Sequence, residues 1–223
     1  MRFIHEKIDL GYDDLVADTK PTGRTYLAPN GNRYPSITTV LSIINEEAIL
    51  QWRKRVGEDE ANRIGTRAAN RGTHVHSIIE RYLKNENTED FLLHIRQSLE
   101  NLRPILDERI GKIYGLEVPL YSDHLGVAGR CDAIADFDGV PSIVDFKTSK
   151  WPKKKEKIPN YFAQMSGYAI MFEERTGMPI TNTVIIMDVD NHEPMVFKEH
   201  RDNYVDLLLK TKAEYDRRKI FRS

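Results

Sequence analysis

The feature that most constrains the fold is a pair of apolar runs, 127–137 and 142–146, on either side of a turn signal. The tetrapeptide Asp136-Phe137-Asp138-Gly139, followed by Val140-Pro141, favours a tight reversal, so the runs predict an antiparallel hairpin. A turn near Asp138-Gly139 pairs residues whose numbers sum to about 277. This register places Asp132 opposite Asp145.

The predicted hairpin gathers three ionisable side chains. Asp145 and Lys147 project from one face of their strand because side chains alternate, and Asp132 faces them from the neighbouring strand. Two facing carboxylates repel each other unless a cation lies between them, and hard oxygen ligands suit Mg²⁺ or Mn²⁺. A salt bridge at an exposed strand end would explain the Asp-x-Lys triplet equally well. The apolar neighbours Ile143, Val144 and Phe146 argue against exposure, since burying unpaired charges is costly.

The rest of the chain changes from helical periodicity to alternation. We expect an irregular lead-in over 1–35, in which a short hairpin can form, and a mainly helical part over 36–110. A catalytic sheet and a helix are expected over 111–199, and a C-terminal helix over 200–223. The helical part is predicted to contain helices at 46–70, 73–83 and 89–109, with Gly72 as a break. Further strands are predicted at 113–121, 183–188 and 195–199, and helices at 160–176 and 201–219. The order indicates one α+β domain with helices on the faces of a sheet.

Composition excludes several classes of function. A hydrophobic share of 40% and a charged share of 30% are typical of a soluble globular protein, and no apolar run is long enough to span a membrane. One cysteine, Cys131, cannot form a disulfide within the chain or hold an iron–sulfur cluster. No phosphate-binding loop motif is present, so no nucleotide cofactor is expected. The amino terminus does not read as a signal peptide, so we expect a cytoplasmic protein, bacterial or from a phage-infected cell, and not a secreted one.

Four segments in order resemble the motifs of a nuclease superfamily. Ile143-Val144-Asp145-Phe146-Lys147-Thr148, preceded by Gly129-Arg130-Cys131-Asp132, resembles motifs II and III of the PD-(D/E)xK superfamily in its RecB-like branch. The run from Gly72 to Glu80 resembles the G-x-x-x-H helix of that branch, and Gln164-Met165-Ser166-Gly167-Tyr168 resembles its Q-x-x-x-Y motif. From Tyr34 to Gly177 the sequence resembles the mitochondrial genome maintenance exonuclease family and its phage and bacterial relatives.

This resemblance implies a restriction-endonuclease-like core, a mixed central sheet of four to five strands flanked by helices, with a helical N-terminal half. It also implies a Mg²⁺- or Mn²⁺-dependent DNA exonuclease that acts on single-stranded DNA from an end. His76, Asp132 and Asp145 would hold the metal, while Lys147 and Gln164 would assist the attacking water and the phosphate. Three further candidates for the centre are Tyr168, Glu80 and Glu117, although Tyr168 also fits a core aromatic and Glu80 a surface acid. The rivals are a structure-specific endonuclease for flaps or branched DNA, a non-catalytic nucleic-acid-binding module and a plain scaffold domain.

Contacts with DNA are predicted outside this centre. Ser36 and Thr38 at a helix start fit either a phosphate site or a simple cap, and Trp52 fits either base stacking or a packed indole. The remaining candidates come from basic segments: Arg53, Arg71, Thr148, Lys150, Trp151 and Lys153. Because no helicase motif is present, unwinding would require a helicase, polymerase or recombination partner.

Overall fold

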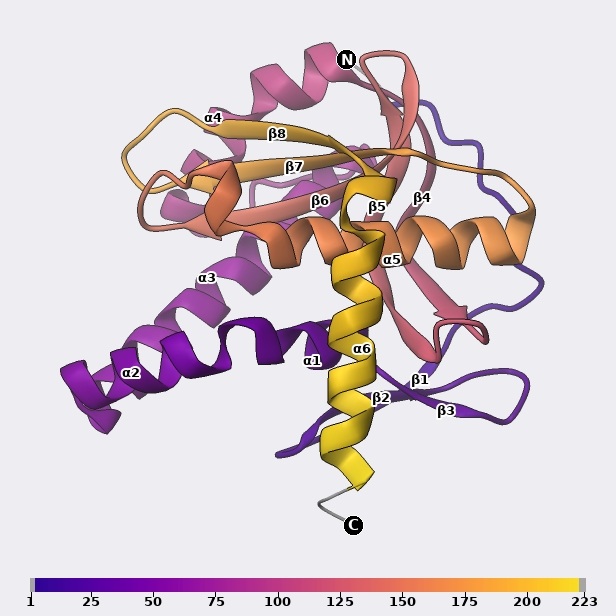
Figure 1. Cartoon of the computed structure of the whole chain (residues 1–223). Helices are drawn as coiled ribbons and strands as arrows, with labels where there is room; N and C mark the ends of the chain where they lie inside the picture. Colours follow the sequence, from indigo (N-terminus) through magenta and orange to yellow (C-terminus); the bar gives the residue numbers. More distant parts are fainter. Residues whose placement is uncertain (1–2, 221–223) are drawn as a thin grey trace.

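A five-stranded mixed sheet in the order β4-β5-β6-β7-β8 forms the centre of the molecule (Figure 1). The computed structural model describes residues 3–220. All neighbouring strands are antiparallel except β6 and β7, which are parallel and joined by a crossover through α5. The strands are β4 (Ile110–Ser122), β5 (Val127–Phe137), β6 (Val140–Ser149), β7 (Asn182–Val189) and β8 (Met195–His200).

Helices cover both faces of this sheet. On one face α5 lies across the strands, and α1 and α6 pack against it over a core that includes Phe162 and Met165 (Figure 1). On the other face α3 and α4 pack over a second core that includes Leu99 and Phe146. The helices are α1 (Ile37–Leu41), α2 (Glu46–Val56), α3 (Glu58–Leu83), α4 (Leu93–Arg109), α5 (Pro159–Thr176) and α6 (Val205–Ile220).

The predicted fold class is confirmed, because the sheet is mixed, has five strands and is flanked by helices. The register of the central hairpin follows the prediction from Phe137 opposite Val140 to Ala133 opposite Val144, but the ladder ends there and does not include the predicted pair of Asp132 and Asp145. Asp138 and Gly139 both have positive φ, 52° and 77°, as a type I′ turn requires. Among the described residues, no helix is both long and apolar enough to cross a membrane.

The segment expected to be irregular contains a second sheet, so that expectation was wrong. Strands β1 (Val16–Lys20), β2 (Gly23–Leu27) and β3 (Arg33–Pro35) form an antiparallel meander below the main sheet (Figure 1). These strands carry little alternation of their own. Contacts distant in sequence stabilise them: Tyr26 is buried against Ala128 and Tyr121. Tertiary packing therefore decides a structure that the local pattern does not show.

The predicted break in the helical part was also misplaced. Helix α2 ends at Gly57, whose positive φ of 87° favours glycine. Helix α3 then continues without interruption through Gly72, where the nearest atom to an added Cβ would be Thr148 Oγ1 at 3.7 Å. A glycine inside a helix costs only about 1 kcal/mol relative to alanine, so packing along α3 outweighs the preference for a break.

Candidate active site

One cleft of about 540 Å³ receives side chains from both sides of the central hairpin. Helix α3 supplies one wall, β4, β5 and β6 supply the floor, and α5 and β2 supply the opposite wall. Nine of the predicted site residues line it: Ser36, Thr38, His76, Glu80, Glu117, Asp132, Lys147, Gln164 and Tyr168. Asp145, which is also a predicted site residue, is buried beside the cleft, with 1% of its surface exposed.

Strands β4 and β5 both change face where they meet the cleft. In β5, Cys131 packs into the core under α5, whereas Ala133 packs into the core under α3 and α4. In β4, Leu116 and Val118 are divided between the same two cores. The ladder pairs Leu116 with Ala133 and then Val118 with Cys131. The residue left between each pair is therefore unpaired, and these two residues, Glu117 and Asp132, turn their side chains to the cleft.

A cluster of three possible metal ligands results from this arrangement. One ligand atom from each of His76, Glu117 and Asp132 lies within 4.8 Å of the others. His76 Nδ1 is 3.4 Å from Asp132 Oδ2, and the same oxygen accepts a hydrogen bond of 2.8 Å from the Phe146 backbone N–H. Asp132 is thus fixed by β6 while it faces α3.

Asp145 lies in a second, adjoining cluster. Lys147 Nζ forms a close ion pair with its Oδ2, and Gln164 Nε2 donates to its Oδ1 at 3.4 Å. Gln164 also approaches the hydroxyl of Tyr168 at 3.3 Å, so one face of α5 presents an amide and a phenol to the strand. The Lys147 ammonium also lies 5.2 Å from the ring centre of Tyr161. Within the predicted i, i+4 pair on α5, Gln164 therefore contacts the predicted carboxylate on β6, and Tyr168 contacts Gln164.

The carboxylates of the cleft disfavour one another's charge. Burial raises the pKa of Asp145 to about 6, the ammonium of Lys147 opposes that rise, and the charge of Asp132 adds to it. Burial raises the pKa of Glu117 to about 7, and the negative charges of Asp132 and Glu80 act in the same direction. Burial opposes the charged form of Lys147, but Asp145 and Asp132 outweigh this effect and raise its pKa.

The donor set fits a hard divalent cation. Two carboxylates and one imidazole converge within coordination range of a single ion, and both carboxylates lie among like charges that a cation would neutralise. Asp145 Oδ2 is buried and accepts no hydrogen bond from the described residues, so its contact is the Lys147 ion pair. Imidazole among the ligands is compatible with Mn²⁺ as well as Mg²⁺.

The predicted DNA contacts divide into two groups. Ser36 lies at the cleft and caps α1, since its hydroxyl accepts from the Thr39 backbone N–H at 3.0 Å, and Thr38 lines the cleft beside it. The others lie outside the cleft. Trp52 and Arg53 are on α2, where Arg53 pairs with Glu58.

The C-terminal end of β6 and the loop after it hold most of the remaining candidates. Thr148 faces Gly72 of α3, and Lys150, Trp151 and Lys153 follow in the loop. Trp151 is 62% exposed. Arg71 is ion-paired with Asp188 and, at 2.7 Å, with Asp190.

Seven of the residues that line the cleft were not predicted as site residues, and three of these have large side chains. Arg24 and Tyr26 come from β2, the strand that the sequence pattern concealed, and Arg130 comes from β5. Arg24 is exposed at the rim, where its backbone N–H donates to Thr39 Oγ1 at 3.0 Å. Its proximity to Ser36 and Thr38 depends on the fold of the N-terminal sheet. No local signal in the sequence marks it.

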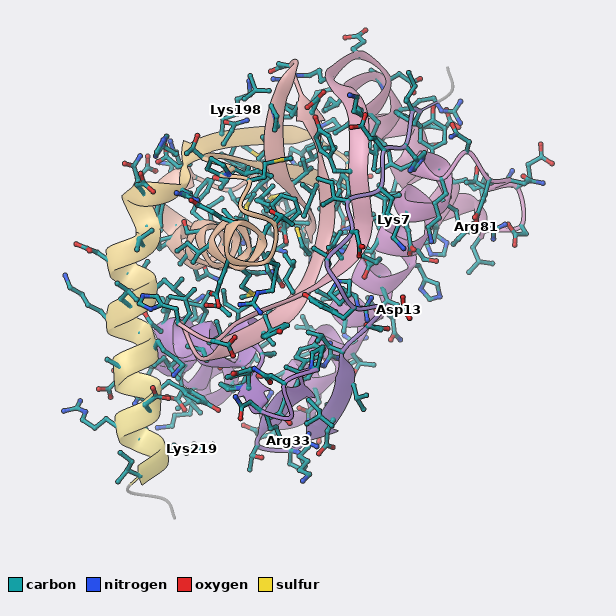
Figure 2. The ribbon with its side chains drawn as sticks, turned by 90° about the vertical axis from the view of Figure 1, so that its right-hand side faces the viewer. Lys7, Asp13, Arg33, Arg81, Lys198 and Lys219 are labelled. Carbon is teal, nitrogen blue, oxygen red and sulfur yellow. The ribbon has the colours of Figure 1, made fainter. Side chains whose placement is uncertain are left out.

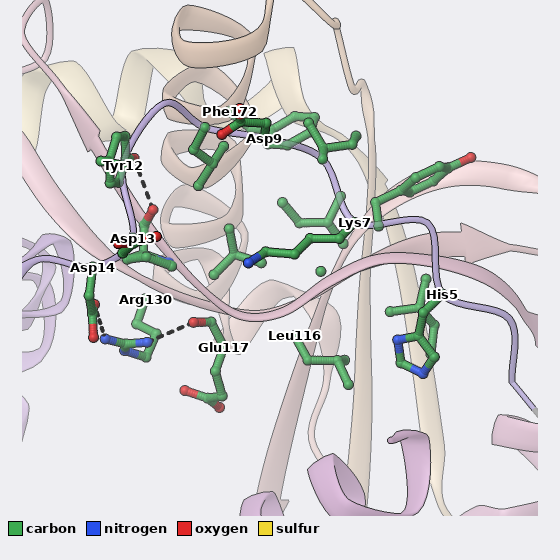
Figure 3. Close-up of a pocket in the computed structure, with 18 of the residues that line it drawn as sticks. His5, Lys7, Asp9, Tyr12, Asp13, Asp14, Leu116, Glu117, Arg130 and Phe172 are labelled. Carbon is green, nitrogen blue, oxygen red and sulfur yellow. Dashed lines mark hydrogen bonds and ion pairs between the residues drawn. The ribbon is translucent and has the colours of Figure 1, made fainter. Parts of the chain in front are cut away.

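A second hollow of about 430 Å³ adjoins the cleft from the other side of β4. The N-terminal segment, residues 5–14, passes over it beside the sheet, as the labels Lys7 and Asp13 show (Figure 2). Figure 3 shows Arg130 between this segment and the strand: it forms an ion pair with Asp14 and donates to the Glu117 carbonyl at 2.7 Å. The Glu117 carboxylate points away from the segment (Figure 3). Arg130 thereby supports the backbone of Glu117, whose φ of 50° is unusual for a residue other than glycine.

Comparison with known proteins adds a family match. The model of the PD-(D/E)XK nuclease superfamily matches residues 90–218, more than half of the 223 residues. Among solved structures, SSO0001 is similar with a TM-score of 0.42 and 12% identity over 81% of this chain and 73% of that one. A presumed exonuclease from Eubacterium rectale is similar with a TM-score of 0.42 and 14% identity over 66% of each chain. At these scores neither likeness bears on function. No curated protein matches the sequence.

Proposed function

Since this chain belongs to the PD-(D/E)XK nuclease superfamily, we propose that it is a metal-dependent deoxyribonuclease that degrades single-stranded DNA from an end. One observation carries the catalytic assignment. His76, Glu117 and Asp132 converge on one point of a cleft, and Asp145 and Lys147 form an ion pair beside them. A scaffold domain has no need to collect so many like charges in one place, because each disfavours the ionisation of the next.

The residues divide into two functions. His76, Glu117 and Asp132 would hold a Mg²⁺ or Mn²⁺ ion, with Asp145 at its edge. Such an ion acidifies a bound water and neutralises charge on a phosphate. Lys147, held in place by Asp145, directs its ammonium to the cleft, where it can orient the attacking water or stabilise the negative charge of the pentavalent phosphate. Gln164 keeps Asp145 oriented and offers its amide to a phosphate oxygen.

The rim of the cleft supplies the substrate contacts. Arg24, Ser36 and Thr38 lie together on the side facing α3, and they offer a guanidinium and two hydroxyls to the backbone of one strand. We extend the proposal to a single strand as the substrate on this basis. Any unwinding of duplex DNA would be the work of a helicase, polymerase or recombination partner.

The decisive experiment is digestion of an end-labelled single-stranded oligonucleotide with Mn²⁺ or Mg²⁺. We expect EDTA to stop digestion, and Lys147→Ala and Asp145→Ala to lower the rate by at least about a hundredfold, as removal of an electrostatic catalyst does. DNA binding by Lys147→Ala, measured by fluorescence anisotropy, should remain within a few-fold of wild type. Lys54→Ala is the matched control, because Lys54 is an exposed lysine on α2, outside the cleft.

The same assay separates the rival functions. Cutting of an oligonucleotide that is blocked at both ends would replace the exonuclease with a structure-specific endonuclease, for which flaps and branched DNA are the next substrates. DNA binding without cutting under any metal would leave a non-catalytic binding module.

A further inference from the structure

Helix α3 separates the catalytic cleft from a second groove. His76 on one side lines the cleft, whereas His74 lines the other groove, because residues two positions apart point about 200° apart around a helix. This groove of about 740 Å³ lies between α3 and the start of α4. The N-terminal half of α3 projects from the body of the molecule together with α2, so both sides of the helix are accessible (Figure 1).

Eight of the nine residues that line this groove have polar or ionisable side chains. Arginines, histidines, amides and one hydroxyl predominate, and within the described chain no carboxylate lines it. Its arginines differ in how far their charge is compensated. Arg71 is paired with Asp188 and Asp190, and Arg63 is paired with Glu60 at 2.8 Å. Arg67 is exposed, and residues 3–220 provide it with no ion pair within 4 Å.

The groove leads toward the loop that follows β6. Arg71 and His94 also line the next hollow, in which His192 takes part. The exposed ring of Trp151 packs edge-on against His192 at 6.0 Å, and the Lys150 ammonium lies 5.8 Å from the centre of that ring. The hollow that contains His192 is also lined by Asp188, Asp190 and Glu193, and the two aspartates are paired with Arg71. The cationic and aromatic groups that remain on the far side of α3 are Arg67 in the groove and the pair Lys150 and Trp151 beyond it. Such a combination binds the backbone and bases of a nucleic acid with little dependence on sequence.

We propose that this groove binds the phosphate backbone of the strand that is not cut, while the cut strand lies in the cleft. The inference rests on the proposed nuclease function. An α-helix with its side chains is roughly 10–12 Å across, so phosphates held on its two sides belong to separate segments of nucleic acid. Helix α3 then stands between two strands where they separate. The preferred substrate is a single-stranded tail that adjoins a duplex.

The test compares two ligands in a Lys147→Ala background with Mn²⁺, in which binding is measured without cutting. One ligand is a fluorescein-labelled single strand, and the other is the same strand annealed to a shorter complement. We expect Arg67→Glu to raise the Kd of the tailed duplex about tenfold and that of the single strand less than about twofold. The slope of log Kd against log salt for the tailed duplex should fall by about one. The matched control is Lys210→Glu, a charge reversal at an exposed residue of α6, which should change neither Kd.

The outcomes separate this proposal from the proposed function. An equal loss of affinity for both ligands would place the cut strand in the groove, and no loss for either would leave the groove without a nucleic-acid ligand; both results overturn the proposal. If the wild-type protein cuts no DNA and yet Arg67→Glu discriminates between the ligands, the nuclease function fails and the groove remains. If the protein cuts DNA and Arg67→Glu is without effect, only the groove proposal fails.

Discussion

At the scale of single residues, Arg24 is a proposed substrate contact that no sequence motif marks. It lies at the rim of the cleft beside Ser36 and Thr38, on a strand that was expected to be irregular. We expect Arg24→Ala to raise KM about tenfold and to leave kcat within a few-fold, because a phosphate contact far from the reacting atoms binds substrate and transition state alike. Steady-state kinetics on single-stranded DNA measure both constants. The control is Arg33→Ala, an exposed arginine on β3 outside the cleft.

Asp138 illustrates a residue whose charge stabilises the fold. Ion pairs with Arg109, at 2.8 Å, and Lys198 hold the pKa of its carboxyl well below the ordinary value. A folded-state pKa below the unfolded one contributes stability above the unfolded value, near pH 4, and this contribution is lost as the pH falls further. We expect Asp138→Asn, which keeps a residue suited to positive φ, to lose about 1 kcal/mol at pH 7, given the exposure of these ion pairs.

Urea unfolding at several pH values checks the sign of this effect. The difference between wild type and Asp138→Asn should be largest near neutrality and should shrink below about pH 4. A difference that stays constant with pH would assign the loss to the turn geometry instead of the charge.

The sequence alone predicts some site residues and misses others for a physical reason. Asp132, Asp145 and Lys147 belong to one hairpin, so the turn predicts that they lie near one another. The side chain of Asp132, however, reaches the cleft only because β5 changes face at this residue. Glu117 could be placed only by position in the preceding strand, because its approach depends on unpaired residues in both β4 and β5. Arg24 depends on the packing of a separate sheet, which no pattern within that segment indicates.

At the scale of elements, the main sheet was predictable and the small one was not. The hairpin and α5 carry strong local signals, among them the Asp-Gly turn and Gly177, whose φ of 72° ends the helix. The β1–β3 meander is held by contacts distant in sequence, such as Tyr26 against Ala128. Propensity decides the first kind of element, and burial provided by the rest of the chain decides the second.

The contact between α1 and α5 offers a test of packing. An added Cβ at Gly167 would lie 2.1 Å from Ile37 Cδ1, so the buried Ile37 side chain, or α1 with it, would have to shift. We expect Gly167→Ala to destabilise the protein by about 1–3 kcal/mol, although alanine is the better helix former. Urea denaturation measures the change, and adding Ile37→Val should restore part of the loss. Gly65→Ala in α3 is the control: no atom lies within 4 Å, and we expect a gain of about 0.5–1 kcal/mol.

At the scale of the whole molecule, the cleft is lined by helices from both faces of the main sheet: α3, which covers one core, and α5, which covers the other. Because α3 supplies His76 and the sheet supplies Glu117 and Asp132, a bound ion would link the two layers. We expect Mn²⁺ to raise the thermal unfolding midpoint, since a ligand at about a hundred times its Kd stabilises the folded state by about 2.7 kcal/mol.

Substitutions in the cleft test whether the Mn²⁺ ion that raises the unfolding midpoint is bound by His76, Glu117 and Asp132. Glu117→Gln should reduce the Mn²⁺-dependent shift and weaken binding at least about tenfold, as even the loss of an indirect partner of a metal does. Glu80→Gln is the matched control, because Glu80 lines the same cleft but is paired with Lys84 at 2.6 Å. An equal effect of both substitutions would assign the shift to the general charge of the cleft. Isothermal titration calorimetry with Mn²⁺ gives the affinities.

The facing pair Glu117 and Asp132 can be regarded as one extra residue in each of two adjacent strands. Without both, Leu116–Ala133 and Val118–Cys131 would become consecutive rungs, and each strand would alternate regularly through this point. Loss of one alone would shift a strand by one residue and turn its apolar side chains to the wrong side. Deleting both residues together would therefore keep the strand pairing and the two cores but remove two of the three candidate metal ligands. We expect this part of the sheet to tolerate deletions only in matched pairs, and the paired deletion to leave a folded protein without the two carboxylates of the candidate metal site.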